Sequence, residues 1–306
     1  MARNLATLIR ELFLLRGYRA RKGGATPWRI RVPYYRNLLR HQALDRWPGA
    51  YVIRTDGHFV HVPAQVDVTA GHRLFKPAEH NPLIETMCRP GDCVLDIGAN
   101  VGDWTLPMAL RVGRQGRVIA FEPVPYLAET VAKTARVNRH DWVEVLQLAL
   151  CATDGMSDFS VERGNSGGSR LGRMNGDFSR TTVRTARLDS LLSERADIDR
   201  VDFIKIDVEG FEDQVLLGAR ETLARFRPPL LIESGFESVE QRRVIHDLLT
   251  TLGFDVIGAL VPGGLIEISW SNYRNNDDIL KTVGLCNLLF LPAAAGAATG
   301  DARLSC

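Results

Sequence analysis

Residues 94–103 read Val-Leu-Asp-Ile-Gly-Ala-Asn-Val-Gly-Asp, and this stretch decides the fold. It opens with an apolar run that ends at Ile97, which is typical of a buried strand. A glycine turn follows, and we expect a helix to begin near Gly102. This order should leave backbone N–H groups open to a ligand, and Gly98 has no Cβ to block its approach. The stretch therefore predicts a strand–turn–helix nucleotide site.

The alternation of β-rich runs and helical stretches continues along the chain. Strands are expected over 93–97, 118–121, 143–148, 202–206 and 230–233, and helices over 102–112, 125–138, 188–195, 212–226 and 238–252. This pattern predicts an α/β fold with a mostly parallel, doubly wound sheet. Further expected elements are a hairpin over 50–62, a short helix over 82–88, a hairpin with a long surface loop over 152–185, and last strands over 254–257 and 285–291.

Composition is that of an ordinary globular protein, but the charge is unevenly distributed. The 306 residues are 45% hydrophobic and 24% charged, and the net charge of +2 does not indicate a nucleic-acid partner. Residues 1–40 hold ten Arg or Lys and one Glu, a net charge of +9. An apolar stripe at helical spacing, from Leu5 to Leu15, lies in this basic arm. Two interpretations stay open: residues 1–22 contact a membrane surface, or the arm packs on the protein with its arginines in water.

Cysteine use and the absence of a long apolar segment indicate a cytoplasmic protein. The five cysteines are odd in number and form no C-x-x-C motif, and Cys93 and Cys286 lie in apolar runs. Free buried thiols are typical of a reducing compartment. We find no signal-peptide pattern and no run of the roughly 20 apolar residues that a membrane span needs. Peripheral contact with the inner face of the membrane would fit the basic arm.

The residues around the glycine turn distinguish between two cofactor classes. Dinucleotide sites require G-x-G-x-x-G, but Asn100 stands where the second glycine would admit a pyrophosphate. Asp96, at the end of the first strand, would repel a pyrophosphate but suits an ammonium group, such as that of S-adenosylmethionine. Glu122 and Pro123 follow the second strand, where an acid can bind both ribose hydroxyls.

Seven short motifs together resemble the FkbM-type methyltransferase family. They are V-L-D-I-G-A-N-V-G (94–102), A-F-E-P-V-P (120–125), L-A-L-C-A-T-D-G (148–155), N-S-G-G-S-R-L (165–171), R-L-D-S-L-L (187–192), I-K-I-D-V-E-G-F-E (204–212) and L-L-I-E-S (230–234). The resemblance covers about residues 82–235. It implies a Rossmann-like class I methyltransferase fold, S-adenosylmethionine as cofactor and O-methylation of sugar hydroxyls, natural products or lipid-linked glycans.

With this resemblance the chain divides into three expected parts. Residues 1–80 form an N-terminal helical and β extension with the basic arm, 81–292 form the methyltransferase domain, and 293–306 form a flexible tail. The expected acceptor is a small molecule, or a hydroxyl of a glycan, glycolipid or natural product, and not a nucleic acid. The oligomeric state is left open.

The candidate site residues lie at the carboxyl ends of the strands, where ligands bind in open α/β sheets. Asp207 is our first candidate for the base that accepts the hydroxyl proton, and Glu233 is the second. Glu209 lies on the same edge, whereas Glu212 is expected to play a structural part at a helix start. Ser169 is a candidate contact for the cofactor carboxylate. The expected cofactor-binding residues are Asp96, Gly98, Asn100, Gly102, Glu122 and Pro123.

Three alternatives remain open at this point. Asp207, Glu209 and Glu233 offer the oxygen ligands that Mg²⁺ prefers, but their spacing does not require a metal and we do not assign one. A nicotinamide-dependent oxidoreductase would use the same architecture, against which Asn100 and Asp96 argue. A non-catalytic binding module would keep the pocket without the reaction.

Overall fold

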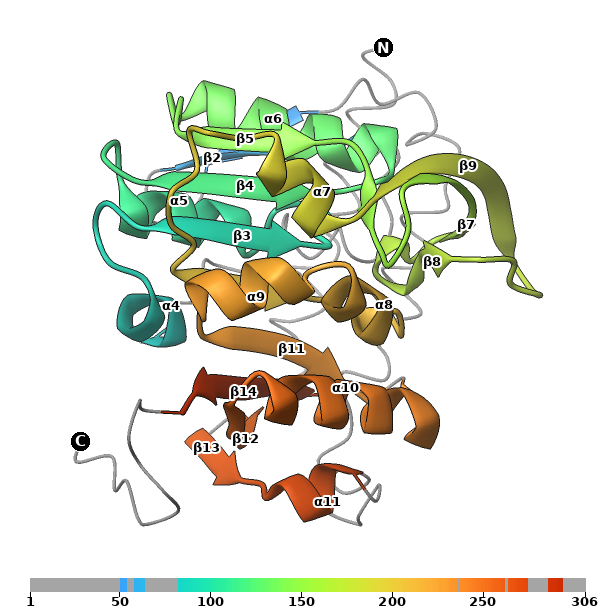
Figure 1. The fold of residues 1–306 in the computed structure, drawn as a ribbon. Helices are drawn as coiled ribbons and strands as arrows, with labels where there is room; N and C mark the ends of the chain where they lie inside the picture. The colour runs from blue at the N-terminus through green and yellow to red at the C-terminus, as the bar shows by residue number, and fades with distance from the viewer. Residues whose placement is uncertain are drawn as a thin grey trace, which may run out of the picture.

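An eight-stranded sheet forms the centre of the computed structural model (Figure 1), which describes residues 50–53, 58–63, 82–235, 237–261, 264–274 and 286–293. The strand order is β13-β12-β14-β11-β10-β3-β4-β5. Strands β11, β10, β3, β4 and β5 are parallel, while β14, β12 and β13 pair antiparallel at one side. Their bounds are β3 Cys93–Ile97, β4 Arg117–Phe121, β5 Val143–Leu146, β10 Phe203–Ile206, β11 Leu230–Ser234, β12 Phe254–Val261, β13 Gly264–Glu267 and β14 Cys286–Pro292.

Helices cover both faces of this sheet, so the prediction of a doubly wound α/β fold is confirmed. Along β10 the side chains alternate, with Phe203 packing on one face and Ile204 on the other. The face of Phe203 meets α4, α5 and α6, and the face of Ile204 meets α7, α8, α9 and α10 (Figure 1). The helices span α4 Pro82–Met87, α5 Thr105–Val112, α6 Pro125–Val137, α7 Leu188–Ser193, α8 Glu212–Leu217, α9 Arg220–Phe226, α10 Val239–Thr251 and α11 Trp270–Arg274.

Two helices differ in extent from the sequence prediction. Helix α5 begins at Thr105 and not near Gly102, since Gly98, Asn100 and Gly102 all have positive φ and keep the backbone out of the helical region. The helix expected over 212–226 is divided into α8 and α9. Gly218 lies at the break, where a Cβ would approach the Cys151 carbonyl oxygen to 2.1 Å.

Residues 149–186 form a second sheet, in the order β6-β9-β7-β8. The predicted hairpin is confirmed by the pairing of β7 with β9, and residues 163–177 form the long connection between them, which holds a 3₁₀ helix and the short strand β8. Buried Phe159 and Val183 recur among polar neighbours and pack under the sheet, a pattern that the polar composition concealed. The elements are β6 Ala149–Leu150, β7 Gly155–Glu162, the 3₁₀ helix η1 Ser166–Gly168, β8 Arg170–Leu171 and β9 Phe178–Ala186.

The expected N-terminal hairpin is also present, as β1 (Ala50–Ile53) and β2 (Phe59–Val62) pair antiparallel. The backbone N–H of His61 donates to Thr134 Oγ1 of α6 at 3.0 Å, which joins the hairpin to the domain. None of the described helices is long and apolar enough to cross a bilayer. The basic arm of residues 1–40 and the tail from residue 294 onward lie outside the described residues.

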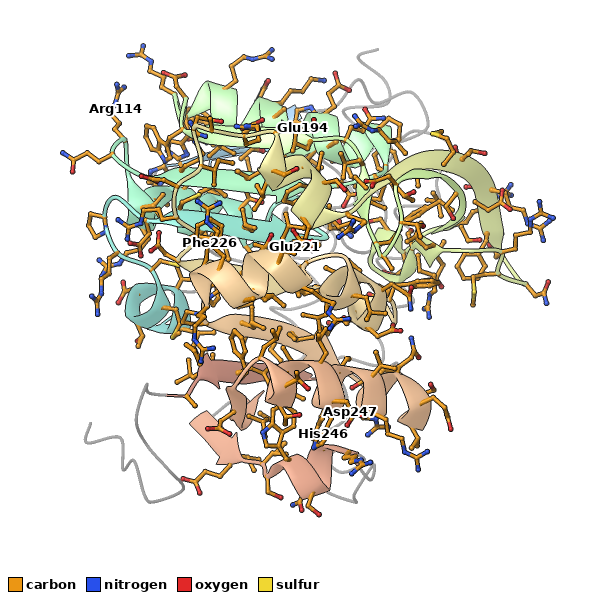
Figure 2. All side chains as sticks on the ribbon, viewed as in Figure 1. Arg114, Glu194, Glu221, Phe226, His246 and Asp247 are labelled. Carbon is orange, nitrogen blue, oxygen red and sulfur yellow. The ribbon has the colours of Figure 1, made fainter. Side chains whose placement is uncertain are left out.

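Figure 2 labels charged side chains that lie on the outside of the domain. Arg114, Glu194 and Glu221 are exposed. By contrast, Cys93 is a buried free thiol in β3, as the sequence predicted. The side chain of Cys286, the other cysteine expected to be buried, lies outside the described residues.

The close contact between Gly98, after β3, and Asp207, after β10, generates a stability prediction. Gly98 has φ +80°, and a Cβ there would lie 1.8 Å from the carbonyl oxygen of Asp207. Gly98→Ala should therefore force β3 and β10 apart, whereas Gly91→Ala, with φ +91° but open space around it, should show only the backbone strain of about 1–2 kcal/mol. Thermal unfolding measures both. Equal melting temperatures for the two variants would show that this contact does not constrain the fold.

Candidate active site

A cavity of about 620 Å³ lies beyond the carboxyl ends of β3, β4, β10 and β11. The loops after these strands form its floor, and residues of the second sheet, including Phe159 and Leu171, form a wall. This is the edge at which ligands bind in open α/β sheets. The sequence placed the site at the same edge.

Several N–H groups of the glycine turn after β3 are already used in hydrogen bonds, so the expectation of open N–H groups does not hold for these positions. The N–H groups of Gly98 and Ala99 both donate to the Phe121 carbonyl oxygen at 3.0 Å. The N–H of Gly102 donates to the Ala99 carbonyl oxygen at 2.7 Å. The turn wraps around the end of β4 because this pairing satisfies its donors. At these positions the turn therefore offers a ligand close access to the backbone rather than free N–H donors.

Glu122 stands at the end of β4 and is held rigidly from two sides. Its Oε2 accepts the N–H of Asn100 at 2.7 Å, and its Oε1 accepts the N–H of Val124 at 2.9 Å. The residue is 4% exposed and lines the cavity. A carboxylate oxygen has two acceptor positions, so each oxygen keeps one for a hydroxyl donor. The geometry suits a ribose with two adjacent hydroxyls.

Asp96 lies deeper than the sequence suggested. It is fully buried and is not among the residues that line the cavity. Its Oδ2 accepts a hydrogen bond from Thr105 Oγ1 at 2.5 Å, and its Oδ1 has no hydrogen-bond partner among the described residues. Burial raises the pKa of Asp96, although the Lys205 ammonium opposes this effect. Direct contact with a cofactor ammonium group stays a prediction, and Asp96 lies beneath the turn that would carry it.

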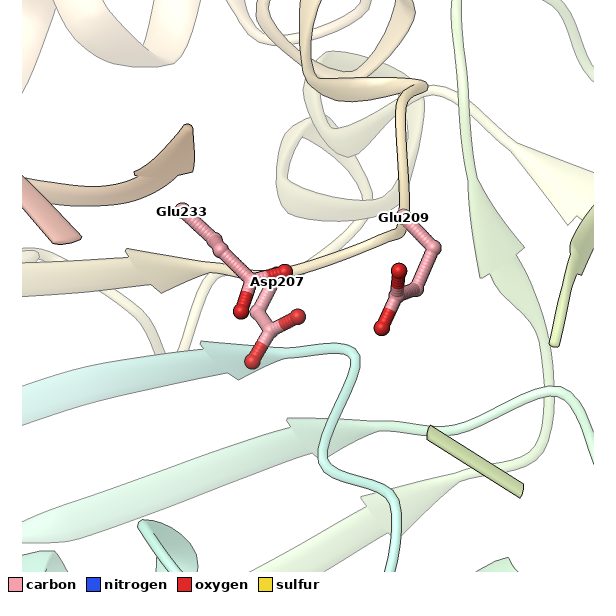
Figure 3. Close-up of side chains that lie close together, drawn as sticks. All are labelled: Asp207, Glu209 and Glu233. Carbon is pink, nitrogen blue, oxygen red and sulfur yellow. The ribbon is translucent and has the colours of Figure 1, made fainter. Parts of the chain in front are cut away.

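At the other side of the cavity, Asp207, Glu209 and Glu233 converge (Figure 3). One carboxylate oxygen from each lies within 4.8 Å of the others. Asp207 directly follows β10 and Glu233 lies near the end of the neighbouring strand β11. Since Ile206 is in register with Ile232, the next residue along each strand is again opposite its neighbour. Strand register thus brings two distant carboxylates together.

Lys205 contacts this carboxylate group from within β10. It is 1% exposed, and its Nζ donates to Asp207 Oδ2 at 2.8 Å. It is in register with Asp96 on β3, and its ammonium lies 5.5 Å from the ring centroid of Trp104. Burial alone would lower the pKa of Lys205, but the Asp207 and Asp96 carboxylates outweigh it and raise that pKa. Lys205 is therefore a charged ammonium.

The protonation of the carboxylates follows from these neighbours. Burial acts to raise the pKa of Asp207, but the Lys205 ammonium and hydrogen bonds from Glu233 and Lys205 bring it below the usual value. Burial and the negative charge of Asp207 raise the pKa of Glu233 to about 10. Burial and Asp207 also raise the pKa of Glu209 to about 8. At neutral pH, Asp207 is thus the ionised member of the group.

Glu209 is aimed into the cavity by a strained turn. Its φ is +58°, an uncommon conformation for a residue with a side chain. Glu212 Oε1 accepts hydrogen bonds from the N–H groups of Val208 and Gly210, the two neighbours of Glu209, each at 3.2 Å. Gln241 of α10 donates to the Gly210 carbonyl oxygen at 2.7 Å. The structural part expected for Glu212 is therefore what the structure shows.

Most of the predicted site residues meet in one cavity, and two do not. Asp96 and Gly102 lie behind the lining. Ser169 lines the cavity, and its Oγ accepts the N–H of Glu162 at 3.1 Å. The residues that line it are Gly98, Asn100, Glu122, Pro123, Asp207, Glu209 and Glu233.

Sequence reasoning missed Lys205 and Trp104. Lys205 stands inside a strand that is buried on both faces, in the sequence Phe-Ile-Lys-Ile. A charged residue in such a run needs a partner, because an unpaired buried charge is costly. This rule could have identified Lys205 from the sequence as a residue that pairs with an acid. Nothing in the sequence distinguished Trp104 from an ordinary core residue.

The described residues fit S-adenosylmethionine. Glu122 offers acceptors for ribose hydroxyls, Gly98 lets a ligand approach the backbone, and the unpaired Oδ1 of Asp96 lies under the turn. A divalent cation fits less well. It would have to bind next to the Lys205 ammonium, which already pairs with Asp207 at 2.8 Å and would repel a second cation.

Comparison with known proteins agrees with this geometry. The family model described as "Methyltransferase FkbM domain" matches residues 96–256, more than half of the chain. "2-O-methyltransferase NoeI" of Sinorhizobium fredii is 28% identical over 48% of this chain and 65% of its own length, so the chain spans less than two thirds of that relative. "Methyltransferase sdnD" of Sordaria araneosa is 28% identical over 53% of this chain and 73% of its own length.

Among solved structures, the chain is similar to "Methyltransferase FkbM" of Methylobacillus flagellatus. The two are 16% identical, with a TM-score of 0.43, over 72% of this chain and 52% of that one.

The two-sided hold on Glu122 predicts a pH-dependent affinity for the cofactor. Burial raises the pKa of Glu122 to about 7, so its ionised form, the better acceptor for hydroxyls, is gained as pH rises through 7. The affinity for S-adenosylhomocysteine should therefore increase between pH 6 and 8. Glu122→Ala should lower it, since each charge-assisted hydrogen bond contributes about 1.5–3 kcal/mol.

Calorimetric titration measures both effects, with Glu129→Gln on the exposed side of α6 as the matched control. A folded Glu122→Ala protein with the parent's affinity would remove Glu122 from the ribose site.

Proposed function

The chain belongs to the FkbM methyltransferase family, and from this premise we propose that it methylates a hydroxyl oxygen of an uncharged acceptor. Family membership supports a methyltransferase that uses S-adenosylmethionine, in agreement with the enzyme class and the cofactor expected from sequence. The observation that supports hydroxyl chemistry is the position of Asp207, which lines the cavity and pairs with the buried Lys205 ammonium at 2.8 Å, so that its carboxylate is kept ionised and can accept a proton.

The chain's own residues provide alignment and a proton acceptor. When bound, S-adenosylmethionine supplies an electrophilic methyl group, so the acceptor oxygen must lose its proton as it is methylated. Asp207 lies at the cavity, is 27% exposed at its side chain and is the carboxylate ready to take a proton at neutral pH. A positioned carboxylate base contributes roughly 10²–10⁴-fold to such a step.

The charge of the cavity favours an uncharged acceptor. Of the described residues that line it, Lys205 is the one cation, and its ammonium is bound to Asp207. A phosphate or carboxylate on the acceptor would meet repulsion from Asp207, which Lys205 holds ionised, and would find no free cation among the lining residues. This supports the prediction of a non-nucleic-acid acceptor such as a sugar hydroxyl. The lining acids are Asp103, Glu122, Asp207, Glu209 and Glu233.

The relatives support oxygen as the reacting atom. NoeI is described as a 2-O-methyltransferase, and we extend that reaction to this chain as part of the proposal. Family membership favours methyl transfer over the hydride transfer of a nicotinamide enzyme. The acceptor class that we propose is a glycan, a glycolipid or a hydroxylated natural product.

Replacing the proposed base tests this function. With an acceptor found by screening neutral hydroxylated compounds for release of S-adenosylhomocysteine, Asp207→Asn should reduce kcat by about 10²–10⁴-fold. Its affinity for S-adenosylhomocysteine should stay close to that of the parent, because Asp207 does not hold the ribose. Glu221→Gln, on the exposed side of α9, is the matched control.

Methylation as fast as the parent's would exclude Asp207 as base. Cofactor binding without turnover of any acceptor class would favour the non-catalytic binding module.

We further propose that residues 1–22 bring the enzyme to an anionic membrane surface, where a lipid-linked acceptor would be presented. The net charge of +9 over residues 1–40 and the apolar stripe from Leu5 to Leu15 support this. In a sedimentation assay, the full chain should pellet together with anionic vesicles. Salt should reduce the bound fraction because it screens exposed charges. Deletion of residues 1–22 should abolish it. A full chain that stays in the supernatant at low salt would contradict the proposal.

A further inference from the structure

Lys205 is the one charged residue inside the central strand β10, and the base assignment alone does not explain it. The strand is Phe203–Ile206, and all four of its residues are buried. A lysine there loses its hydration, which is costly unless carboxylates replace the water. Two carboxylates do so, on either side of it: Asp96 in register on β3 and Asp207 at 2.8 Å.

The neighbouring strand β11 contributes a further carboxyl group, that of Glu233. Glu233 lies beside Asp207, and one carboxylate oxygen of each is within 4.8 Å of the other (Figure 3). Two carboxyl groups this close in a site shielded from water do not readily ionise together, so the pair holds one proton at neutral pH. The Lys205 ammonium is bound to Asp207, which places the negative charge on Asp207 and the proton on Glu233.

We propose that Lys205 is a positioning residue for methyl transfer: it holds Asp207 ionised while Glu233 carries the single proton that the carboxyl pair shares. Asp207 and Glu233 therefore have different tasks and are not interchangeable bases. This inference rests on the proposed function. In the reaction, the acceptor O–H bond breaks and its proton moves to Asp207, the new O–CH₃ bond forms, and the electron pair of the broken C–S bond stays on sulfur.

The proton count is then restored without a further reactant. After the transfer the pair holds two protons, and the Lys205 ammonium favours the return of one from Asp207 to water. The side chain of Asp207 is 27% exposed, which gives the proton a path to solvent. The other titratable groups that face the pair are acids, Asp96 on β3, Glu122 after β4 and Glu209 in the turn after β10. Lys205 is the cation that opposes them.

Removal of the ammonium tests the proposal through the pH profile. In Lys205→Met, Asp207 should bind its proton more tightly, and the acid limb of kcat/KM should move up by about 1–3 pH units. Activity at pH 7 should fall and then recover as the pH is raised toward 9. A purely structural defect would lower the activity at every pH. Lys133→Met, a lysine on the outside of α6 paired with Glu129, is the matched control and should keep the parent profile.

Infrared spectroscopy tests the proton count without an acceptor or turnover. The parent should show the C=O band of an un-ionised carboxyl group at pH 8, and Glu233→Gln should remove one such band while keeping a donor to Asp207. An acid limb in Lys205→Met that coincides with the parent's would overturn the proposal. So would a spectrum at pH 8 that Glu233→Gln leaves unchanged.

The two measurements also separate this proposal from the proposed function. If no hydroxyl acceptor is methylated, the function fails, while the infrared result still decides where the proton lies. If Lys205→Met proves too unstable to assay, Glu233→Gln and the parent spectrum still decide the protonation of the pair.

Discussion

The buried ammonium of Lys205 is the interaction on which the site depends. An unpaired charge inside β10 would be strongly destabilising, so the strand can stay in the centre of the sheet only if acids surround it. Asp96 on one neighbouring strand and Asp207 at the strand end meet that requirement. The same contacts fix the ionisation of the carboxylates that face the cavity. The need to pair one buried charge thus shapes both the core and the chemistry.

Parallel register converts this local requirement into an active site. Strand β10 lies between β3 and β11, so the residues that follow it meet partners from both sides. The N–H of Asp207 donates to the Ile97 carbonyl oxygen at 3.0 Å, and this contact requires glycine at position 98. Glu122, tied to Asn100, completes the cavity from β4. Cofactor and proton acceptor therefore lie at the same edge because adjacent strands end there.

The sequence predicted the parts of this arrangement that depend on local pattern. The apolar runs and the glycine turn indicated the parallel sheet, and the acids after successive strands indicated its functional edge. The sequence pattern could not show how deeply each of these residues is buried. Asp96 is buried beneath the turn because it faces α5 and Thr105, and the turn's N–H groups are used by Phe121. Lys205 was overlooked because its role arises from residues on two other strands. The second sheet around Phe159 was predicted only in part, as a hairpin with a long loop, because its apolar residues are few, although they alternate.

A crystal structure with S-adenosylhomocysteine tests the central claim most directly. We predict that both ribose hydroxyls donate to the carboxylate of Glu122 and that the sulfur faces Asp207 across the cavity. The Lys205 ammonium should stay bound to Asp207 in that complex, with Glu233 hydrogen-bonded to the same carboxylate. A ligand whose ribose lies away from Glu122, or whose sulfur is turned away from Asp207, would contradict the account.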